Sequence, residues 1–99
     1  MIVVYVSVKI RPGATSGFER MISEIQGEVR KMPGCVKMEW YSVPNDPERY
    51  ITYGEFVTQE DFERYLNSAS VKRINDELIP LLEVPPEFSH YQATILESS

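Results

Sequence analysis

The sequence has few residues that build cross-links or metal sites: one cysteine, Cys35, and one histidine, His90, among 99 residues. A single cysteine excludes an internal disulfide and is typical of a reducing compartment, so we expect a cytoplasmic protein. His90 has no second histidine or cysteine at metal-ligand spacing, so we expect no metal. Cys35 follows a Pro-Gly turn and is expected to be a small buried residue, not a nucleophile.

The chain also lacks a cationic excess and a long apolar run. Its formal net charge is −5 at pH 7, whereas nucleic-acid binding needs clustered cationic side chains. Anionic membrane surfaces repel an acidic chain as well. The apolar residues 2–10 lack the basic region of a signal peptide, and no run approaches the roughly 20 apolar residues of a membrane span. We therefore expect neither a nucleic-acid nor a membrane partner.

The spacing of the apolar residues predicts one domain over residues 1–99, built around four strands. Alternation of apolar with other residues is typical of half-buried strands. It recurs in four segments, 2–10, 35–43, 50–57 and 89–96. The connection over residues 44–47 reads Pro-Asn-Asp-Pro, which is too rich in proline to continue a strand and predicts a turn.

Three helices are expected between these strands. Helical spacing predicts the first over residues 16–32, begun by a capping box of Ser16 and Glu19. Thr58 should cap a second helix, and a third should bend or end at Pro80, which has no amide hydrogen. The inward residues of the third are expected to be Val71, Ile74, Leu78 and Leu81. The order β-α-β-β-α-α-β predicts an α+β, ferredoxin-like split β-α-β fold, with helices on one face of a four-stranded antiparallel sheet.

The two faces of this sheet should differ in polarity. The apolar face is expected to meet the helices and to carry Val4, Val6, Val8, Val36, Met38 and Trp40. The other face is polar but rich in tyrosine, which is typical of a protein–protein interface. We expect a symmetric homodimer, sheet against sheet, with a solvated face as the alternative. The expected interface residues are Tyr5, Lys37, Glu39, Tyr41, Tyr53 and Glu55, with His90, Gln92 and Thr94 on the same face.

Residues 39–56, EWYSVPNDPERYITYGEF, hold five of the eleven aromatic residues. Some of these rings should point towards the helices, beside a glycine that leaves room for a neighbour or a ligand. The hypothesis is an aromatic slot for a small planar molecule, with Tyr65 relaying protons from above. The expected pocket residues are Val6, Trp40, Tyr50, Gly54, Phe56 and Ser70. The alternative is that these rings are ordinary core.

Glu39 and Glu55 are expected on adjacent strands of the interface face. They could form a general acid/base pair. We favour ion pairs, across the sheet or the interface, with Lys9 and Lys37, which should lie on the same face.

Three segments of the chain resemble the antibiotic biosynthesis monooxygenase (ABM) domain family. They are IRPG, MPGCVKMEWYSVPNDPERYITYGEFVTQEDFERYL and LIPLLEVPPEF. The resemblance covers nearly the whole chain and rests on the order and spacing of the segments. It implies a dimeric α/β barrel. Known members include cofactor-independent oxygenases of phenolic or quinone-type aromatics, heme-degrading monooxygenases and an isomerase of a signalling sugar phosphate.

The chain differs from known ABM members at several positions that are functional in those proteins. Many ABM enzymes have histidines near the positions of Tyr65 and Ser70, and this chain has none there. Heme-degrading members have asparagine, tryptophan and histidine where this chain has Val6, Phe56 and Asn75, which argues against heme degradation. We therefore expect a cofactor-independent monooxygenase of a small phenolic or quinol-type substrate, or a non-catalytic dimeric module that binds a small aromatic ligand or supports assembly. A cavity beside Tyr65 or Ser70 would favour the enzyme.

Overall fold

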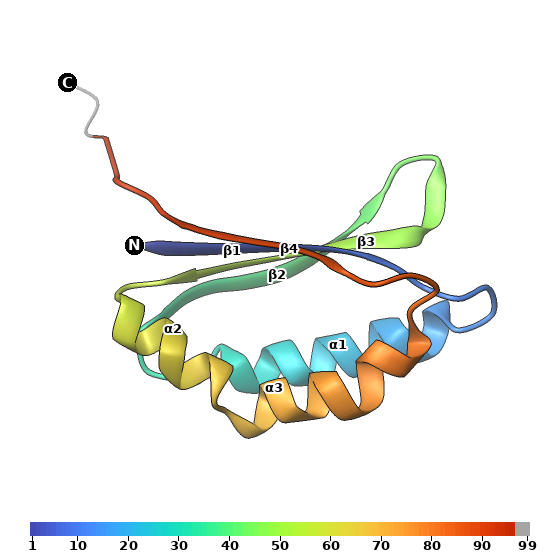
Figure 1. Cartoon of the computed structure of the whole chain (residues 1–99), viewed down its shortest axis with the longest axis horizontal. Helices are drawn as coiled ribbons and strands as arrows, with labels where there is room; N and C mark the ends of the chain where they lie inside the picture. Colours follow the sequence, from blue (N-terminus) through green and yellow to red (C-terminus); the bar gives the residue numbers. More distant parts are fainter. Residues whose placement is uncertain (97–99) are drawn as a thin grey trace.

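Four strands form one antiparallel sheet in the order β2-β3-β1-β4. They are β1 (Ile2–Lys9), β2 (Cys35–Val43), β3 (Asp46–Phe56) and β4 (Glu87–Gln92). All the helices lie against one face of this sheet, and the other face is left open (Figure 1). This computed structural model describes residues 1–96, so the last three residues of the expected domain lie outside it. The α+β ferredoxin-like fold expected from the sequence is confirmed.

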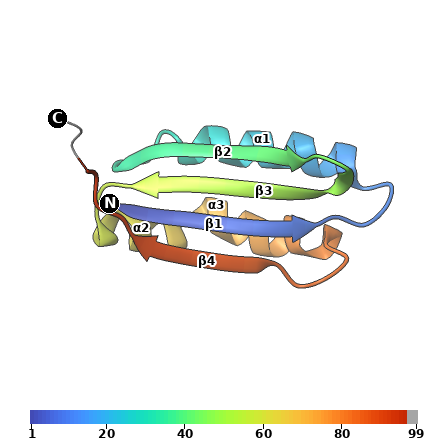
Figure 2. The same ribbon diagram turned by 90° about the horizontal axis from the view of Figure 1, so that it is seen from above.

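The helical layer has two parallel rows. One row is α1 (Thr15–Val29). The other row is formed by α2 (Gln59–Leu66) and α3 (Ala69–Arg73), and it continues through the π-helical turn η1 (Ile74–Leu78) and the 3-10 turn η2 (Ile79–Leu81). Seen from above, α1 lies behind β2 and β3, and α3 lies behind β1 and β4 (Figure 2). Within residues 1–96, no helix is long and apolar enough to span a bilayer.

The helix ends follow the sequence signals in part. Thr58 caps α2, because its hydroxyl accepts a hydrogen bond from the Asp61 amide at 3.1 Å. The helical run ends at η2, which contains Pro80, as predicted. The capping box at Ser16 is wrong, because α1 already begins at Thr15 and has no side-chain cap. Glu19 accepts a hydrogen bond from the Tyr50 hydroxyl instead.

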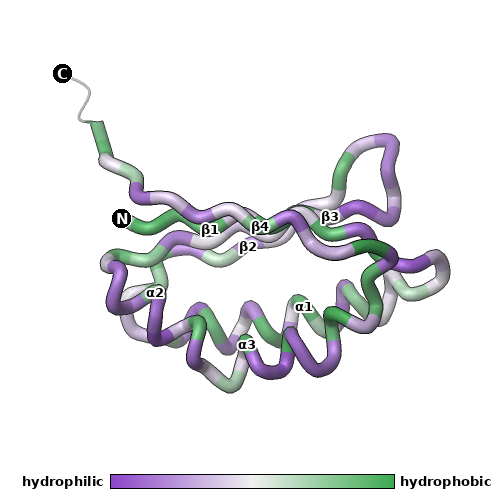
Figure 3. The backbone as a smooth tube through the Cα atoms, viewed as in Figure 1, coloured by the Kyte–Doolittle hydropathy of each residue, from purple (hydrophilic) through white to green (hydrophobic). Residues whose placement is uncertain are grey.

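The core lies between the inner face of the sheet and the helices. Hydropathy alternates along the strands and helices, as this two-layer packing requires (Figure 3). The buried apolar residues that form the central cluster are Ile2, Val4, Val8, Ile10, Phe18, Ile22, Ile25, Val29, Met38, Tyr50, Phe56, Phe62, Leu78 and Leu82.

The Pro-rich connection is shorter than predicted. Asn45 takes up the reversal with a φ of 65°, and β3 begins at Asp46. Pro47 is tolerated in this strand because the β2–β3 ladder shifts register there and leaves Pro47 unpaired. The last strand runs over residues 87–92 in place of the expected 89–96.

Val36 does not face the helices as expected; it is 53% exposed. The β2–β3 register shifts between Cys35 and Lys37, so Val36 is an extra residue in β2. Cys35 takes the inward place and packs half-buried against the core. Strict alternation fails here because a bulge adds one residue to one strand only.

His90 and Gln92 lie on the inner face of the sheet, not on the interface face predicted from the sequence. They pair with Val4 and Ile2, which puts both on the side of the helices. The His90 ring centroid lies 5.4 Å from that of Phe62. All six residues of β4 are exposed, so no apolar alternation marks its inner face in the sequence. Thr94 lies beyond the strand.

Candidate functional site

A cavity of about 270 Å³ lies between the inner face of the sheet and the segment from α3 to η2. Val6 and Val8 of β1 and Thr52 of β3 line it from the sheet, and Phe88 of β4 lines one edge. Fifteen of the described residues form the wall. Among them, only Thr52, Tyr65 and Asn75 have a side chain that can donate or accept a hydrogen bond. The cavity is therefore apolar, with three polar groups.

Small side chains open this space in the sheet. Val6 lies directly opposite Thr52 in the β1–β3 ladder. On either side of this pair, the inner face of β3 carries the large buried rings of Tyr50 and Phe56. The gap over Gly54 is filled by Met38, whose terminal methyl would lie 2.7 Å from an added Cβ. The empty space is therefore confined to the region around Val6 and Thr52.

The opposite wall comes from an irregular helical segment. In η1 the helix widens, and the Ile79 amide donates to the Ile74 carbonyl five residues back. The widening lies just before Pro80, which has no amide hydrogen to continue an α-helical ladder. Asn75 and Leu78 of this turn line the cavity. Isolated π-helical turns are frequent at functional sites.

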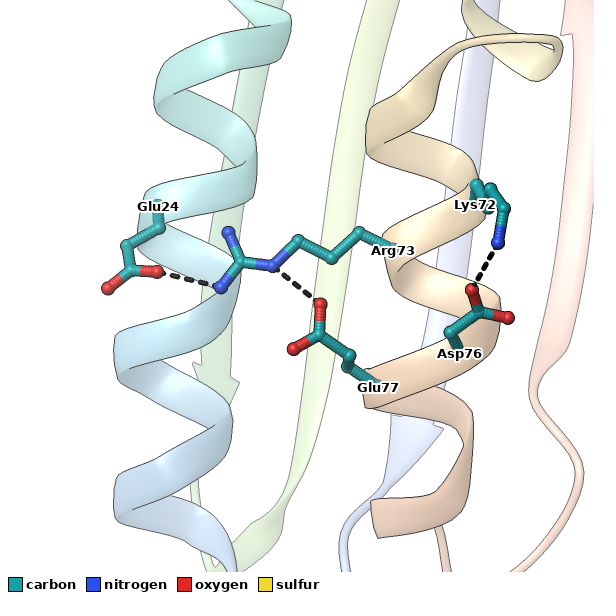
Figure 4. A network of polar contacts seen from close by, with 5 residues as sticks. All are labelled: Glu24, Lys72, Arg73, Asp76 and Glu77. Atoms are coloured by element: carbon teal, nitrogen blue, oxygen red, sulfur yellow. Dashed lines mark hydrogen bonds and ion pairs between the residues drawn. The ribbon is translucent and has the colours of Figure 1, made fainter.

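Charged residues brace the outside of this wall. Arg73 donates to Glu24 of α1 and to Glu77 of η1, both at 2.8 Å, and so ties the two helical rows together (Figure 4). Lys72 and Asp76 pair at 2.7 Å beside it. None of these five side chains lines the cavity, which leaves its interior uncharged. Within residues 1–96 no group of His, Cys, Asp and Glu side chains is placed to hold a metal ion.

Tyr65 reaches the cavity from the last turn of α2. Its ring lies 5.0 Å from Phe56 and 6.3 Å from Phe62, between centroids. Burial raises the pKa of Tyr65 to about 12, and the neighbouring Cys35 acts in the same direction. The hydroxyl therefore stays protonated near neutral pH and is a hydrogen-bond donor, not a general base. The structure records no hydrogen bond from it to any residue of 1–96.

The other residues of the predicted slot lie outside the cavity wall. The Trp40 indole donates to Ser23 of α1 at 3.3 Å. Tyr50 is buried against Phe18 and donates to Glu19 at 2.5 Å. Phe56 and Ser70 are buried in the packed layer beside the cavity. Of the predicted set, only Val6 and Tyr65 line the cavity, although Trp40 lies directly opposite the lining residue Thr52 in the β2–β3 ladder.

Sequence reasoning missed Thr52 and Asn75 as site residues. Thr52 is unremarkable in an alternating strand, and only its position opposite Val6 makes it part of the wall. The signal for Asn75 was Pro80, five residues later, because a proline often distorts the helical turn before it. The π-helical turn itself leaves no pattern in the sequence.

The open face of the sheet brings the predicted interface residues together. Tyr5, Tyr53 and Glu39 form one row across three strands, and Lys37 and Glu55 lie opposite each other in the next. Tyr5 is 37% and Tyr41 is 48% exposed. Exposed aromatic rings on an otherwise polar sheet are typical of an interface.

Within one protomer, Glu39 and Glu55 of this face form none of the ion pairs favoured from the sequence among residues 1–96. Lys9 pairs with Asp46 at 2.5 Å. Glu55 accepts a hydrogen bond from the Tyr53 hydroxyl at 2.5 Å, and this bond raises the pKa of Tyr53 to about 12. The structure records no ion pair of Glu39 or Glu55 with a basic residue among 1–96.

Comparison with solved structures finds the same fold in many proteins. A protein from Nitrosomonas europaea that carries the ABM name has a TM-score of 0.89 at 18% identity, over 96% of this chain and 100% of its own. One from Deinococcus radiodurans with the same name has a TM-score of 0.90 at 13% identity, over 100% and 98%. A conserved protein from Methanosarcina mazei has a TM-score of 0.88 at 20% identity, over 94% and 92%. At these identities the likeness shows the fold alone.

The sequence comparisons identify the family. A search of curated proteins gives no match. The family model described as antibiotic biosynthesis monooxygenase matches residues 1–77, which covers β1 to α3, all of η1 except Leu78, and most of the cavity wall. The chain therefore belongs to the antibiotic biosynthesis monooxygenase family.

Proposed function

We propose that the protein is a cofactor-independent monooxygenase that oxidises a small phenolic or quinol-type compound in the cavity between sheet and helices. The observation that carries this proposal is an apolar cavity whose lining residues include Tyr65, a tyrosine with no recorded hydroxyl partner within residues 1–96. A concave apolar site with a few polar groups is the usual form of a small-molecule site. Membership of the ABM family supports the reaction class.

The reaction needs no external reductant if the substrate supplies the electrons. A phenol with hydrogen on its para carbon reacts with O₂ to give the para-quinone and water. One oxygen atom forms the new carbonyl, and the other leaves as water with the hydrogens of the hydroxyl and of the para carbon. The substrate gives up four electrons, and O₂ takes up all four. The protein then has to hold the ring, exclude bulk water and deliver a proton.

Tyr65 suits the last of these tasks. Its raised pKa keeps it protonated, so it can donate a hydrogen bond or a proton to a peroxide oxygen as the O–O bond breaks. No histidine or carboxylate lines the described cavity to remove the substrate's own proton. We therefore expect kcat to rise with pH towards the pKa of the substrate hydroxyl.

Oxygen uptake with α-naphthol tests this proposal. The expected product is naphthoquinone, with one O₂ consumed per molecule. Tyr65→Phe is expected to lower kcat by about 10²-fold, the usual size of a proton-transfer contribution, with little change in KM. Tyr91→Phe is the control, because it removes the same hydroxyl from an exposed tyrosine that does not line the cavity. Saturable binding without oxygen uptake would instead support the non-catalytic ligand-binding module.

We further propose that the open face of the sheet forms a homodimer. Tyr5 lies on β1, between β3 and β4, near the middle of this face. Tyr5→Arg would put one cation from each protomer into the interface, so we expect dissociation to monomers in sedimentation equilibrium. Val84→Arg, at an exposed loop position, should leave the dimer intact. A wild-type chain that is monomeric at all concentrations would contradict the proposal.

A further inference from the structure

We infer that the ligand of the cavity is a neutral compound of one or two fused rings, held by Thr52 and Asn75, which set its specificity. This inference rests on the proposed function, because it narrows the substrate class of the same site. It goes beyond the resemblance, which compares Asn75 only with the histidine of heme-degrading members and gives Thr52 no role.

The volume of the cavity limits the size of the ligand. An engineered protein cavity of about 150 Å³ lined by apolar side chains holds one benzene molecule. At about 270 Å³, the cavity has room for one ring or two fused rings. A third fused ring would need movement of the buried Phe18, Ile22 and Leu78, or would extend past the exposed Leu66, Ile79 and Phe88 of the wall into solvent.

The chemistry of the wall limits the charge of the ligand. None of the fifteen lining residues carries a charge. The nearest basic side chains of the helical wall, Lys72 and Arg73, are engaged with Asp76, Glu77 and Glu24 outside the cavity. An ionised carboxylate would therefore lose its hydration without gaining a partner, which is strongly unfavourable.

Thr52 and Asn75 lie on opposite walls, one in the sheet and one in η1. The threonine hydroxyl and the asparagine amide can each donate or accept a hydrogen bond. No hydrogen bond of either side chain within residues 1–96 is recorded, so both are available to a ligand. They can meet a phenol hydroxyl as acceptors or a quinone carbonyl as donors. Substrate and product should therefore both bind.

Anaerobic calorimetry on the full chain tests the size and charge limits. The probes are phenol, α-naphthol, the three-ring α-anthrol and α-naphthoate, which has the rings of naphthol with a negative charge. We expect α-naphthol to bind tightest, α-anthrol to bind more weakly because its third ring does not fit in the cavity, and α-naphthoate to bind at least about tenfold more weakly than α-naphthol. Naphthoquinone should compete with α-naphthol. Equal binding of α-anthrol or α-naphthoate, or no binding of any probe, would overturn the inference.

Two near-isosteric variants test the residues. Asn75→Leu and Thr52→Val should each weaken α-naphthol binding about three- to tenfold, the usual worth of one hydrogen bond. Binding of naphthalene, which has no polar group, should not change. Equal weakening for both compounds would mean that the two residues only shape the wall, and would overturn their assignment.

The outcome is separable from that of the proposed function because binding is measured without oxygen. The expected binding pattern without oxygen uptake in air would leave the inference standing and refute the monooxygenase. Oxygen uptake with three-ring phenols alone would support the monooxygenase and refute the inference.

Discussion

Replacing Phe56 by alanine is expected to destabilise the protein by about 3–5 kcal/mol, the usual loss for a fully buried phenylalanine. The Phe56 side chain is inaccessible to solvent and lies within 5.0 Å of Tyr65 and 5.8 Å of Phe62, between ring centroids. Small domains are stable by about 5–15 kcal/mol, so much of the folding free energy would be lost. The measurement is the free energy of unfolding in urea.

Phe88→Ala is the matched control, because it is the same truncation at a side chain that is 49% exposed. We expect a loss below about 1 kcal/mol there. Phe56→Leu keeps most of the buried volume and should remain folded if the alanine variant does not. If the Phe56→Ala and Phe88→Ala proteins were equally stable, the assignment of Phe56 to the core would be contradicted. The aromatic slot predicted beside Phe56 would then again be a candidate ligand site.

Replacing Val6 by phenylalanine is expected to weaken binding of α-naphthol by at least about 10²-fold. Val6 points from the middle of β1 into the cavity opposite Thr52, so an added ring would occupy the space that a ligand needs. Overpacking a filled core costs about 1–3 kcal/mol, and here the ring enters empty space, so the loss of stability should be at the low end of this range. Calorimetry gives the affinity, and urea unfolding gives the stability.

Val84→Phe makes the same change at an exposed position outside the cavity wall and should bind like the parent protein. A well-folded Val6→Phe protein with unchanged affinity would mean that the ligand binds elsewhere. The hollow beside Cys35 and Lys37 at the edge of β2 would then be the next site to test.

The sequence predicts most of the fold because strand alternation and helix signals are local. The inner faces of β1 and β3 and the Thr58 cap follow from residues that are neighbours in the chain. The position of Val36 depends on a bulge, which is a property of two strands together. The face of His90 depends on the register of an exposed edge strand that has no apolar pattern.

The candidate site is less predictable because it depends on how segments that are distant in the sequence pack together. Parity places Gly54 on the inner face of the sheet, but only the packed structure shows that Met38 fills the room it leaves. Tyr65 and Val6 reach the cavity as members of the predicted set. Asn75 reaches the cavity through a π-helical turn. The size of an empty space depends on the side-chain volumes of both layers, and no single segment of the sequence contains this information.

A methyl-detected NMR titration of the protein with α-naphthol under anaerobic conditions tests the central claim most directly. The claim is that a small aromatic ligand binds between the sheet and the π-helical turn. It predicts saturable shifts of the methyl signals of Val6, Val71 and Leu78 that exceed any shift of the Trp40 indole N–H signal, which is bonded to Ser23. Saturable shifts at Trp40 with none at these three methyl-bearing residues would contradict it.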